Sequence, residues 1–198
     1  DGSTGFVING IDAGDHSGGS VSSAGDINGD GIDDLVIGAY GGDTNGSNSG
    51  ESYVVFGTSA GFGSSLELSA LDGSNGFVLN GIDEQDFSGF SVSAAGDVNG
   101  DGIDDLIIGA FGADPNGNSS GESYVVFGDS AGFGSSLELS TLDGSNGFVI
   151  NGIDAGDGSG RSVSSAGDIN GDGIDDLIIG AHQGDPNGTD SGESYVVF

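Results

Sequence analysis

The chain has no cysteine, tryptophan or methionine, and it has two prolines and a single basic side chain, Arg161, in 198 residues. Without cysteine there are no disulfides, no thiolate chemistry and no soft-metal sites. The formal net charge is −31, so no basic cluster can neutralise phosphate groups, and nucleic acid and anionic membrane surfaces are excluded as direct partners. No apolar run approaches the ~20 residues that span a bilayer, so we expect no membrane insertion.

Glycine, by contrast, is abundant, with 44 residues placed at fixed points between short apolar runs. The spacing shows a tandem repeat of 71 residues, seen in the series Asp26, Asp97 and Asp168. The copies are nearly identical over most of the period, so the glycines indicate tight turns rather than low complexity. We expect one domain, 1–198, of three units, 1–71, 72–142 and a truncated 143–198.

Each repeat offers four strand candidates of four to six residues, bounded by glycine, asparagine, aspartate or serine. In the central copy they are Ser91–Gly96, Asp105–Ala110, Ser123–Phe127 and Gly147–Asn151. The nearest approach to a helical pattern, Leu66–Leu71, is too short to stand alone. Short antiparallel strands in tandem predict an all-β fold in which each repeat forms one four-stranded β-propeller blade. A parallel β-helix is the main rival, although its repeats are usually much shorter.

The most distinctive stretch is Gly25–Leu35, which recurs as 96–106 and 167–177. Each copy holds four aspartates and an asparagine within nine residues, and carboxylates at that density repel one another unless a cation lies among them. The spacing of Asp26, Asn28, Asp30 and Asp34 is typical of oxygen ligands around Ca²⁺, with Gly31 permitting the sharp turn.

An EF-hand has a bidentate glutamate at the twelfth loop position, which the chain lacks. The residues at that position are apolar: Ile37, Ile108 and Ile179. They belong to β-branched runs that indicate buried strands. The loop is therefore expected to join two strands and not two helices.

The segments Phe87–Val92 and Gly96–Ala110 resemble the FG-GAP repeat, which builds the integrin α-subunit propeller and many bacterial surface proteins, and the likeness covers all three units. By spacing and by this resemblance, three Ca²⁺ ions per chain are expected, held by side chains and by the backbone carbonyl of each isoleucine. The expected ligands are Asp26, Asn28, Asp30, Ile32, Asp34, Asp97, Asn99, Asp101, Ile103, Asp105, Asp168, Asn170, Asp172, Ile174 and Asp176.

The alternative for these loops is an Asx-turn that only reverses the chain. Mg²⁺ is disfavoured, because it demands a tight octahedron and keeps its waters. Asp33 and its equivalents alternate away from Asp34, so we expect them to be solvated or beside the ligands. The chain departs from the family pattern at Ser88-Gly89, where Phe-Gly is expected, and in lacking a proline after Gly-Ala. No metal ligand changes, but the family's partner-binding loops do not carry over.

The sequence and the resemblance together predict a non-catalytic, calcium-stabilised scaffold for adhesion or recognition, in an extracellular or cell-surface location. We recognise no signal peptide in the chain. The alternative is a propeller lectin that binds glycans between blades, and an enzyme is the third class. Three sets of equivalent positions differ among the repeats and are candidates for contact with a protein or glycan: His16, Phe87 and Gly158; Gly19, Phe90 and Arg161; Tyr40, Phe111 and His182.

The repeats also predict how the ring closes. The segment Gly57–Leu71 joins a third strand to the fourth strand that follows it, and it has no third copy in the sequence. The sequence therefore opens with a fourth-strand segment, Gly5–Asn9, and ends with a third-strand segment, Ser194–Phe198. Three blades are fewer than the usual four to eight. We therefore expect a two-fold homodimer with six blades, in which Gly5–Asn9 of each chain adds to Ser194–Phe198 of the other.

Overall fold

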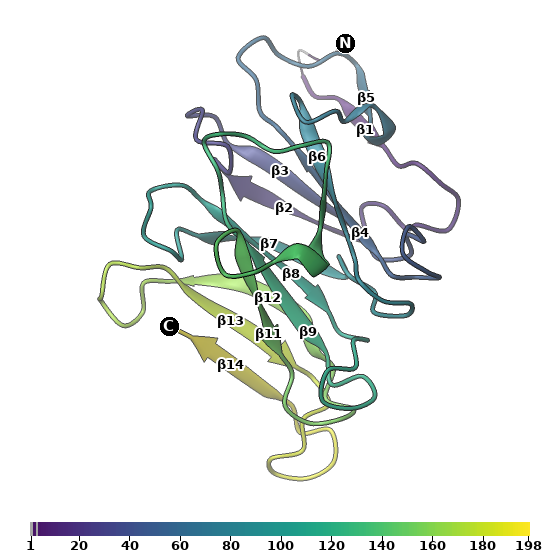
Figure 1. Ribbon diagram of the computed structural model, residues 1–198, viewed down its shortest axis with the longest axis vertical. Coiled ribbons are helices and arrows are strands. Elements are labelled where there is room, and N and C mark those ends of the chain that lie inside the picture. Colours follow the sequence, from purple (N-terminus) through teal and green to yellow (C-terminus); the bar gives the residue numbers. More distant parts are fainter. Residues whose placement is uncertain (1, 3) are drawn as a thin grey trace.

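The computed structural model describes residue 2 and residues 4–198, which form short strands and turns (Figure 1). The strands are β1 (Val7–Asn9), β2 (Ser20–Gly25), β3 (Asp34–Ala39), β4 (Glu51–Val55), β5 (Ser65–Glu67), β6 (Gly76–Asn80), β7 (Ser91–Gly96), β8 (Asp105–Ala110), β9 (Glu122–Val126), β10 (Ser136–Glu138), β11 (Gly147–Asn151), β12 (Ser159–Gly167), β13 (Asp176–Ala181) and β14 (Glu193–Val197). Two 3₁₀ turns, η1 (Leu68–Ala70) and η2 (Leu139–Thr141), follow β5 and β10. The all-β prediction is confirmed.

The strands form three successive antiparallel sheets, one for each repeat. The first has the order β2-β3-β4-β6, the second β7-β8-β9-β11 and the third β12-β13-β14. The four-stranded blade is confirmed for the first two repeats, and the third has three strands among the described residues. Antiparallel pairing within each blade rules out a parallel β-helix.

The predicted strand bounds are close to the observed ones. In the central repeat, three strands begin and end where predicted, whereas the third spans Glu122–Val126 instead of Ser123–Phe127. Glu122 pairs with Ala110, and the Phe127 N–H turns away to the Asn146 carbonyl. The predicted Gly5–Asn9 strand is shorter, Val7–Asn9, because β5 is its partner and pairs along three residues. Asp1, the expected start of the first unit, lies outside the described residues.

Each of the first two repeats adds a fifth strand that the sequence analysis missed. The stretch Leu66–Leu71 does not form a helix but divides into the end of β5 and the turn η1. β5 pairs in parallel with β1, and β10 with β6 of the preceding blade. The Asn80 side chain donates to Glu138 Oε1 at 2.6 Å across this pairing. A three-residue strand that pairs across repeats has no local periodicity for sequence analysis to detect.

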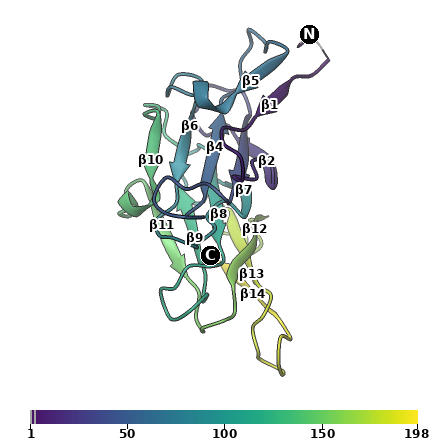
Figure 2. The same ribbon diagram turned by 90° about the vertical axis from the view of Figure 1, so that its right-hand side faces the viewer.

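Successive blades touch along their first strands, with β7 between β2 and β12. The Val92 N–H donates to Ser20 Oγ, and the Val163 N–H to Ser91 Oγ, both at 3.1 Å. Small residues permit this approach: a Cβ atom on Gly38 would collide with the Gly89 carbonyl of the next blade. Figure 2 shows these strands on one side of the molecule and the outer strands β6 and β10 on the other.

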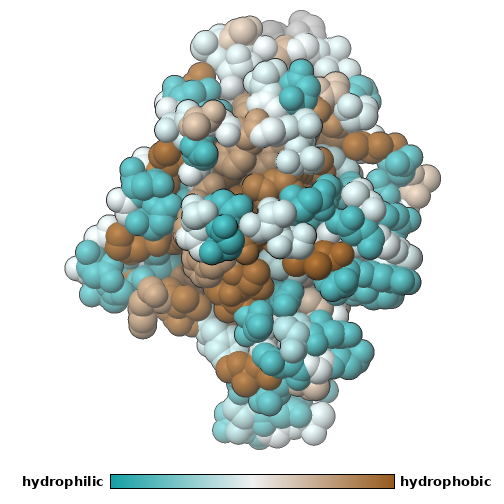
Figure 3. Space-filling view, in the orientation of Figure 1, coloured by the Kyte–Doolittle hydropathy of each residue, from teal (hydrophilic) through white to brown (hydrophobic). Residues whose placement is uncertain are grey.

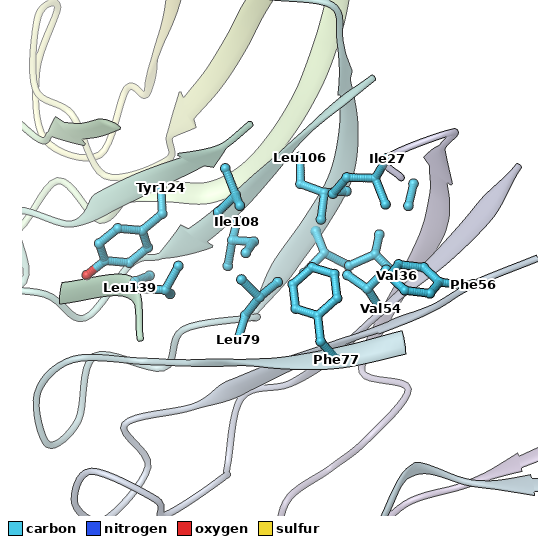
Figure 4. Close-up of a cluster of buried hydrophobic side chains, with 14 of the residues drawn as sticks. Ile27, Val36, Val54, Phe56, Phe77, Leu79, Leu106, Ile108, Tyr124 and Leu139 are labelled. Atoms are coloured by element: carbon cyan, nitrogen blue, oxygen red, sulfur yellow. The ribbon is translucent and has the colours of Figure 1, made fainter. Parts of the chain in front are cut away.

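The hydrophobic core lies between the blades. Ile27, Val36 and Val54 of the first blade face Leu106 and Ile108 of the second (Figure 4). A second cluster fills the space between the second and third blades in the same way. Burying each such side chain contributes roughly 1.5–3 kcal/mol, so the junctions between blades supply much of the stability of the fold.

Candidate metal centres

The three acidic loops join β2 to β3, β7 to β8 and β12 to β13. The prediction that they connect strands is therefore confirmed. The turn depends on glycine, since Gly31, Gly102 and Gly173 have φ values of 87°, 87° and 91°. This left-handed conformation is costly for any residue with a Cβ atom.

Within each loop, carboxylate and amide oxygens accept hydrogen bonds from the loop backbone. In the first loop, Asp26 Oδ1 accepts from the Asp30 N–H at 2.9 Å, and Asp26 Oδ2 accepts from the Gly31 N–H at 2.8 Å. Asn28 Oδ1 also accepts from Asp30 N–H, at 2.9 Å. The other two loops repeat these bonds. The backbone thus holds the ligand candidates Asp26 and Asn28 in a tight turn that keeps their oxygens within one loop.

The last aspartate of each loop is buried. Asp34 accepts from the Ile27 N–H at 3.2 Å and from the Gly57 N–H at 2.7 Å, which ties the loop to the segment after β4. Asp105 makes the equivalent pair of bonds with Val98 and Gly128. Burial raises the pKa of both carboxyl groups to about 6, and the neighbouring loop aspartates add to the rise. Asp176 accepts from the Ile169 N–H at 2.8 Å.

The aspartates before these buried ones link blades. Asp104 Oδ2 accepts from the Asp26 N–H of the preceding blade at 2.8 Å, and Asp175 Oδ2 accepts from the Asp97 N–H at 3.2 Å. Asp33, the first of the set, is exposed. The sequence analysis expected these residues to be solvated or beside the ligands, and it did not foresee the bonds of Asp104 and Asp175 to the preceding blade. The isoleucines Ile32, Ile103 and Ile174 precede these aspartates, and Ile103 and Ile174 extend toward glycines of the preceding loop.

The loop residues fit a hard divalent cation. The candidate metal ligands in each loop are all oxygen atoms. In the first loop, the buried carboxylate of Asp34 lies near the carboxylates of Asp26 and Asp30. The one basic side chain of the protein, Arg161, lies at the opposite end of the blades. Among the described residues, no three acidic or histidine side chains already converge on one point. Binding would therefore require the loop carboxylates to turn toward a common centre.

A second group of carboxylates, which the sequence analysis missed, lies at the other end of each blade. In the first blade it comprises Asp12, Asp15, Asp43 and Glu51, around a cavity of about 440 Å³. In the second it comprises Asp83, Asp86, Asp114 and Glu122, around a cavity of about 350 Å³. The signal was present in the sequence, because these acids recur at the same period of 71 residues as the loop acids.

Buried carboxylates in this group have raised pKa values. Burial, with Asp83, Glu122 and Asp114 nearby, raises the pKa of Asp86 to about 6. Burial also raises the pKa of Asp15. A hydrogen bond from the Tyr124 hydroxyl to Glu122 Oε2 at 2.6 Å is one of the contacts that hold the group.

The positions that differ among the repeats gather into one aromatic surface at this same end of the blades. His16 stacks on Tyr40 with ring centroids 5.0 Å apart, and Tyr40 lies 5.3 Å from Phe90 of the next blade. Phe90 and Phe87 pack against Phe111. Arg161 of the third blade lies over Phe90 and Phe111, at 4.2 and 4.5 Å from their centroids. We call these residues the aromatic strip: His16, Tyr40, Phe87, Phe90, Phe111 and Arg161.

The strip has an interruption in the third repeat. Gly158 stands where the other repeats carry His16 and Phe87, and a Cβ atom there would lie 3.2 Å from the His182 ring. His182 is exposed, whereas most of the strip is half-buried. The sequence analysis identified these positions as variable, but their contact across blades could only come from the structure.

The fold and the loops together define a propeller-like repeat protein with an acidic loop in every blade. A family model described as the FG-GAP repeat matches three segments, residues 17–55, 88–126 and 159–197. The chain belongs to the FG-GAP repeat family, and the resemblance seen in the sequence is confirmed. Comparison with curated proteins gave no match.

Among the described residues, no helix is long and apolar enough to cross a membrane.

Proposed function

We propose that the protein is a non-catalytic, calcium-stabilised FG-GAP scaffold that serves extracellular adhesion or surface recognition. Each loop would hold one Ca²⁺ through its aspartate and asparagine side chains and one backbone carbonyl, giving three ions per chain. The bound ion would neutralise the loop carboxylates and fix the turn between the first two strands of the blade. Affinity is expected near about 10⁻⁴ to 10⁻³ M, as for extracellular modules.

The observation that carries this proposal is the buried, uncompensated charge of the loops. Asp34 and Asp105 are fully buried beside other carboxylates, and no basic side chain is near them. An isolated buried carboxylate is costly unless it is protonated or paired with a cation. The chain contains one arginine and no lysine, so a cation that pairs with these carboxylates would come from outside the protein.

Thermal unfolding in EDTA and in increasing calcium tests the proposal. Stability should rise with the logarithm of free calcium, by about 2.7 kcal/mol per loop at a hundredfold excess over Kd. Magnesium at the same concentration is the matched control and should stabilise much less, because Mg²⁺ gives up its waters reluctantly. A melting temperature that does not change across millimolar calcium would show that the ions have no structural role.

The aromatic strip favours a second candidate function, glycan binding. Half-exposed rings of Tyr40, Phe87, Phe90 and Phe111 lie side by side across two blades, and such rings can stack on the apolar faces of sugars. A glycan array would distinguish a lectin from a scaffold. Binding that is lost in Phe90→Ala but retained in Ile153→Ala, a variant elsewhere on the surface, would favour the lectin. A reducing-sugar release assay tests the enzyme class, which has little support because His16 and His182 occupy non-equivalent positions.

A further inference from the structure

The first blade exposes a face that is buried in the other two blades. Val21 of β2 is 66% exposed, whereas its equivalent Val92 is 4% exposed because it packs against the preceding blade. Leu35 is likewise exposed, and its equivalents Leu106 and Leu177 are buried. The residue types are the same in all three repeats, so the difference arises because no blade among the described residues packs against this face.

The third blade exposes the opposite face. Val196 of β14 is 41% exposed, whereas the equivalent Val54 is fully buried against the next blade. Ile169 and Ile178 are exposed where Ile27 and Val36 are buried. Phe198 is also exposed, and Figure 3 shows apolar surface around the C-terminal end of β14. The two end faces are therefore the two halves of a junction that the chain makes twice within itself.

The polar groups at these faces show the same pattern. Each internal junction has a serine Oγ that accepts from a valine N–H, and an aspartate that accepts from the first N–H of the preceding metal loop. A third set of the same groups is present, and within residues 4–198 it makes no such bonds: Ser162 and Asp168 on the third blade, Val21 and Asp33 on the first. A Cβ atom on Gly96 would collide with Asp175, whereas one on Gly167 would meet nothing within 4 Å.

We propose that the two end faces bind each other across a second copy of the chain, and that Asp33 of that copy completes the third metal loop. Asp33 would accept from the Asp168 N–H as Asp104 does from the Asp26 N–H. Ser162 Oγ would likewise accept from the Val21 N–H of the second copy. For the metal, this inference rests on the proposed function, but the docking of the faces does not.

The strand edges support the same partner. β6 pairs antiparallel with β4 so that Asn80 opposes Glu51 and Gly76 opposes Val55. By the repeat, Asn9 of the second copy opposes Glu193, and Gly5 opposes Val197. Phe6 stacks on Phe62 in the same way as its equivalent Phe77 stacks on Phe133. Phe77 also lies beside Phe56, so Phe6 of the second copy would lie beside Phe198, the equivalent of Phe56. The edge of β14 and the free edge of β1 would then be paired with each other.

A second copy fits better than closure within one chain. β1 pairs with β5 and lies far from β14, at the top and the lower left of Figure 1, so the two strands do not pair within one chain. Two chains give six blades, and a two-fold axis uses the same junction twice and leaves no unmatched face. The charge of −31 on each chain opposes association, so calcium and salt should strengthen it.

Sedimentation of the 198-residue chain in calcium and in EDTA tests the inference. A mass near 38 kDa, twice the chain mass of 19.2 kDa, is expected in calcium. Val21→Asp should give a folded monomer, because Val21 is already exposed in the single chain. Ala131→Asp is the control: Ala131 is exposed although it lies beside a junction that the chain makes within itself, its equivalent Ala60 is exposed as well, and this variant should remain dimeric. A monomer of the unchanged chain at high micromolar concentration, or equal masses for the two variants, would overturn the proposal.

A second variant tests the role of Asp33. Asp33→Ala should weaken the dimer about a hundredfold, because the two-fold axis repeats the lost charge-assisted hydrogen bond and each bond accounts for about tenfold. It should leave the circular dichroism spectrum and the melting of the isolated monomer unchanged, because Asp33 is exposed there. A dimer whose affinity is unaffected would refute the contact. Failure of the proposed function looks different: the dimer would form equally in EDTA, and calcium would not change the melting temperature.

Discussion

The two ends of the blades use acidic side chains in different ways. At the loop end, the three repeats carry the same residues, and their carboxylates bind backbone N–H groups of their own loop and of the neighbouring blade. The opposite end carries both the carboxylates that line cavities and the aromatic strip, whose residues change from repeat to repeat. The acidic residues recur in all three repeats at both ends, whereas the aromatic strip changes from repeat to repeat. The loop end therefore ties strands and blades together, and the proposed recognition function belongs to the strip at the opposite end.

The largest expected effect is a change of stability with pH in the absence of calcium, caused by buried carboxyl groups at the loop end and at the opposite end of the blades. The pKa values of Asp34, Asp105 and Asp86 are raised to about 6, so the folded protein binds more protons than the unfolded chain between pH 4 and 6. Stability must then fall as pH rises through this window. In EDTA, we expect the protein to be more stable at pH 5 than at pH 7.5, by about 1 kcal/mol for each of the three groups.

Thermal unfolding at the two pH values measures this effect. Calcium should reduce it at the loop end, because a bound cation favours the ionised carboxylates. Stability in EDTA that rises between pH 5 and 7.5 would contradict the assigned direction of these pKa values.

The second prediction concerns substitutions of the buried aspartates in the acidic loops alone. Asp105→Ala removes the acceptor for the half-buried Val98 N–H and the buried Gly128 N–H, as well as a proposed calcium ligand. It should lower the free energy of unfolding by roughly 1–3 kcal/mol in saturating calcium. Equivalent losses are expected for Asp34→Ala and Asp176→Ala. Asp105→Asn is the control, since it keeps an acceptor oxygen and should lose stability mainly in calcium.

The sequence was sufficient for features set by local pattern. The glycine-bounded strands, the loop between β2 and β3, and the three strands of the third sheet all follow from short-range spacing and from the 71-residue period. It was insufficient for contacts between repeats. The parallel strand β10, the bond from Asp104 to the preceding loop, and the ring contact of Phe90 with Tyr40 join residues that are tens of positions apart. Such contacts depend on how blades stack, which no local pattern encodes.

A third experiment compares the opposite end with the loop end. Asp86→Asn keeps an acceptor for the Asp83 N–H, which donates to Asp86 Oδ2 at 3.2 Å, and removes a buried charge near Glu122 and Asp114. At pH 7.5 we expect the variant to be more stable by about 1 kcal/mol, in calcium as well as in EDTA. Urea unfolding in both conditions measures this. A loss of stability seen in calcium alone would show that this end also holds a cation, and the contrast between the ends would disappear.

The smallest effect concerns the aromatic strip. Arg161→Ala removes a guanidinium that lies over two half-exposed rings, so a loss of about 0.5–1 kcal/mol is expected. Arg161→Lys is the control and should recover part of it, because lysine keeps the charge but lacks the planar group that stacks on a ring. The dependence of the melting temperature on calcium should be the same in all three proteins.

The calcium dependence should stay the same because the aromatic strip lies far from the acidic loops. Phe111, which Arg161 covers, follows the last residue of β8, and Asp105 is the first residue of the same strand. The rise of a strand places the two sites about 20 Å apart. Sites separated by more than about 10 Å without shared partners usually contribute additively, within about 0.5 kcal/mol. The double variant Asp105→Ala/Arg161→Ala should therefore lose the sum of the two single losses. A coupling above 1 kcal/mol would mean that the blade transmits strain from the calcium loop to the aromatic strip, and that calcium could regulate what the strip binds.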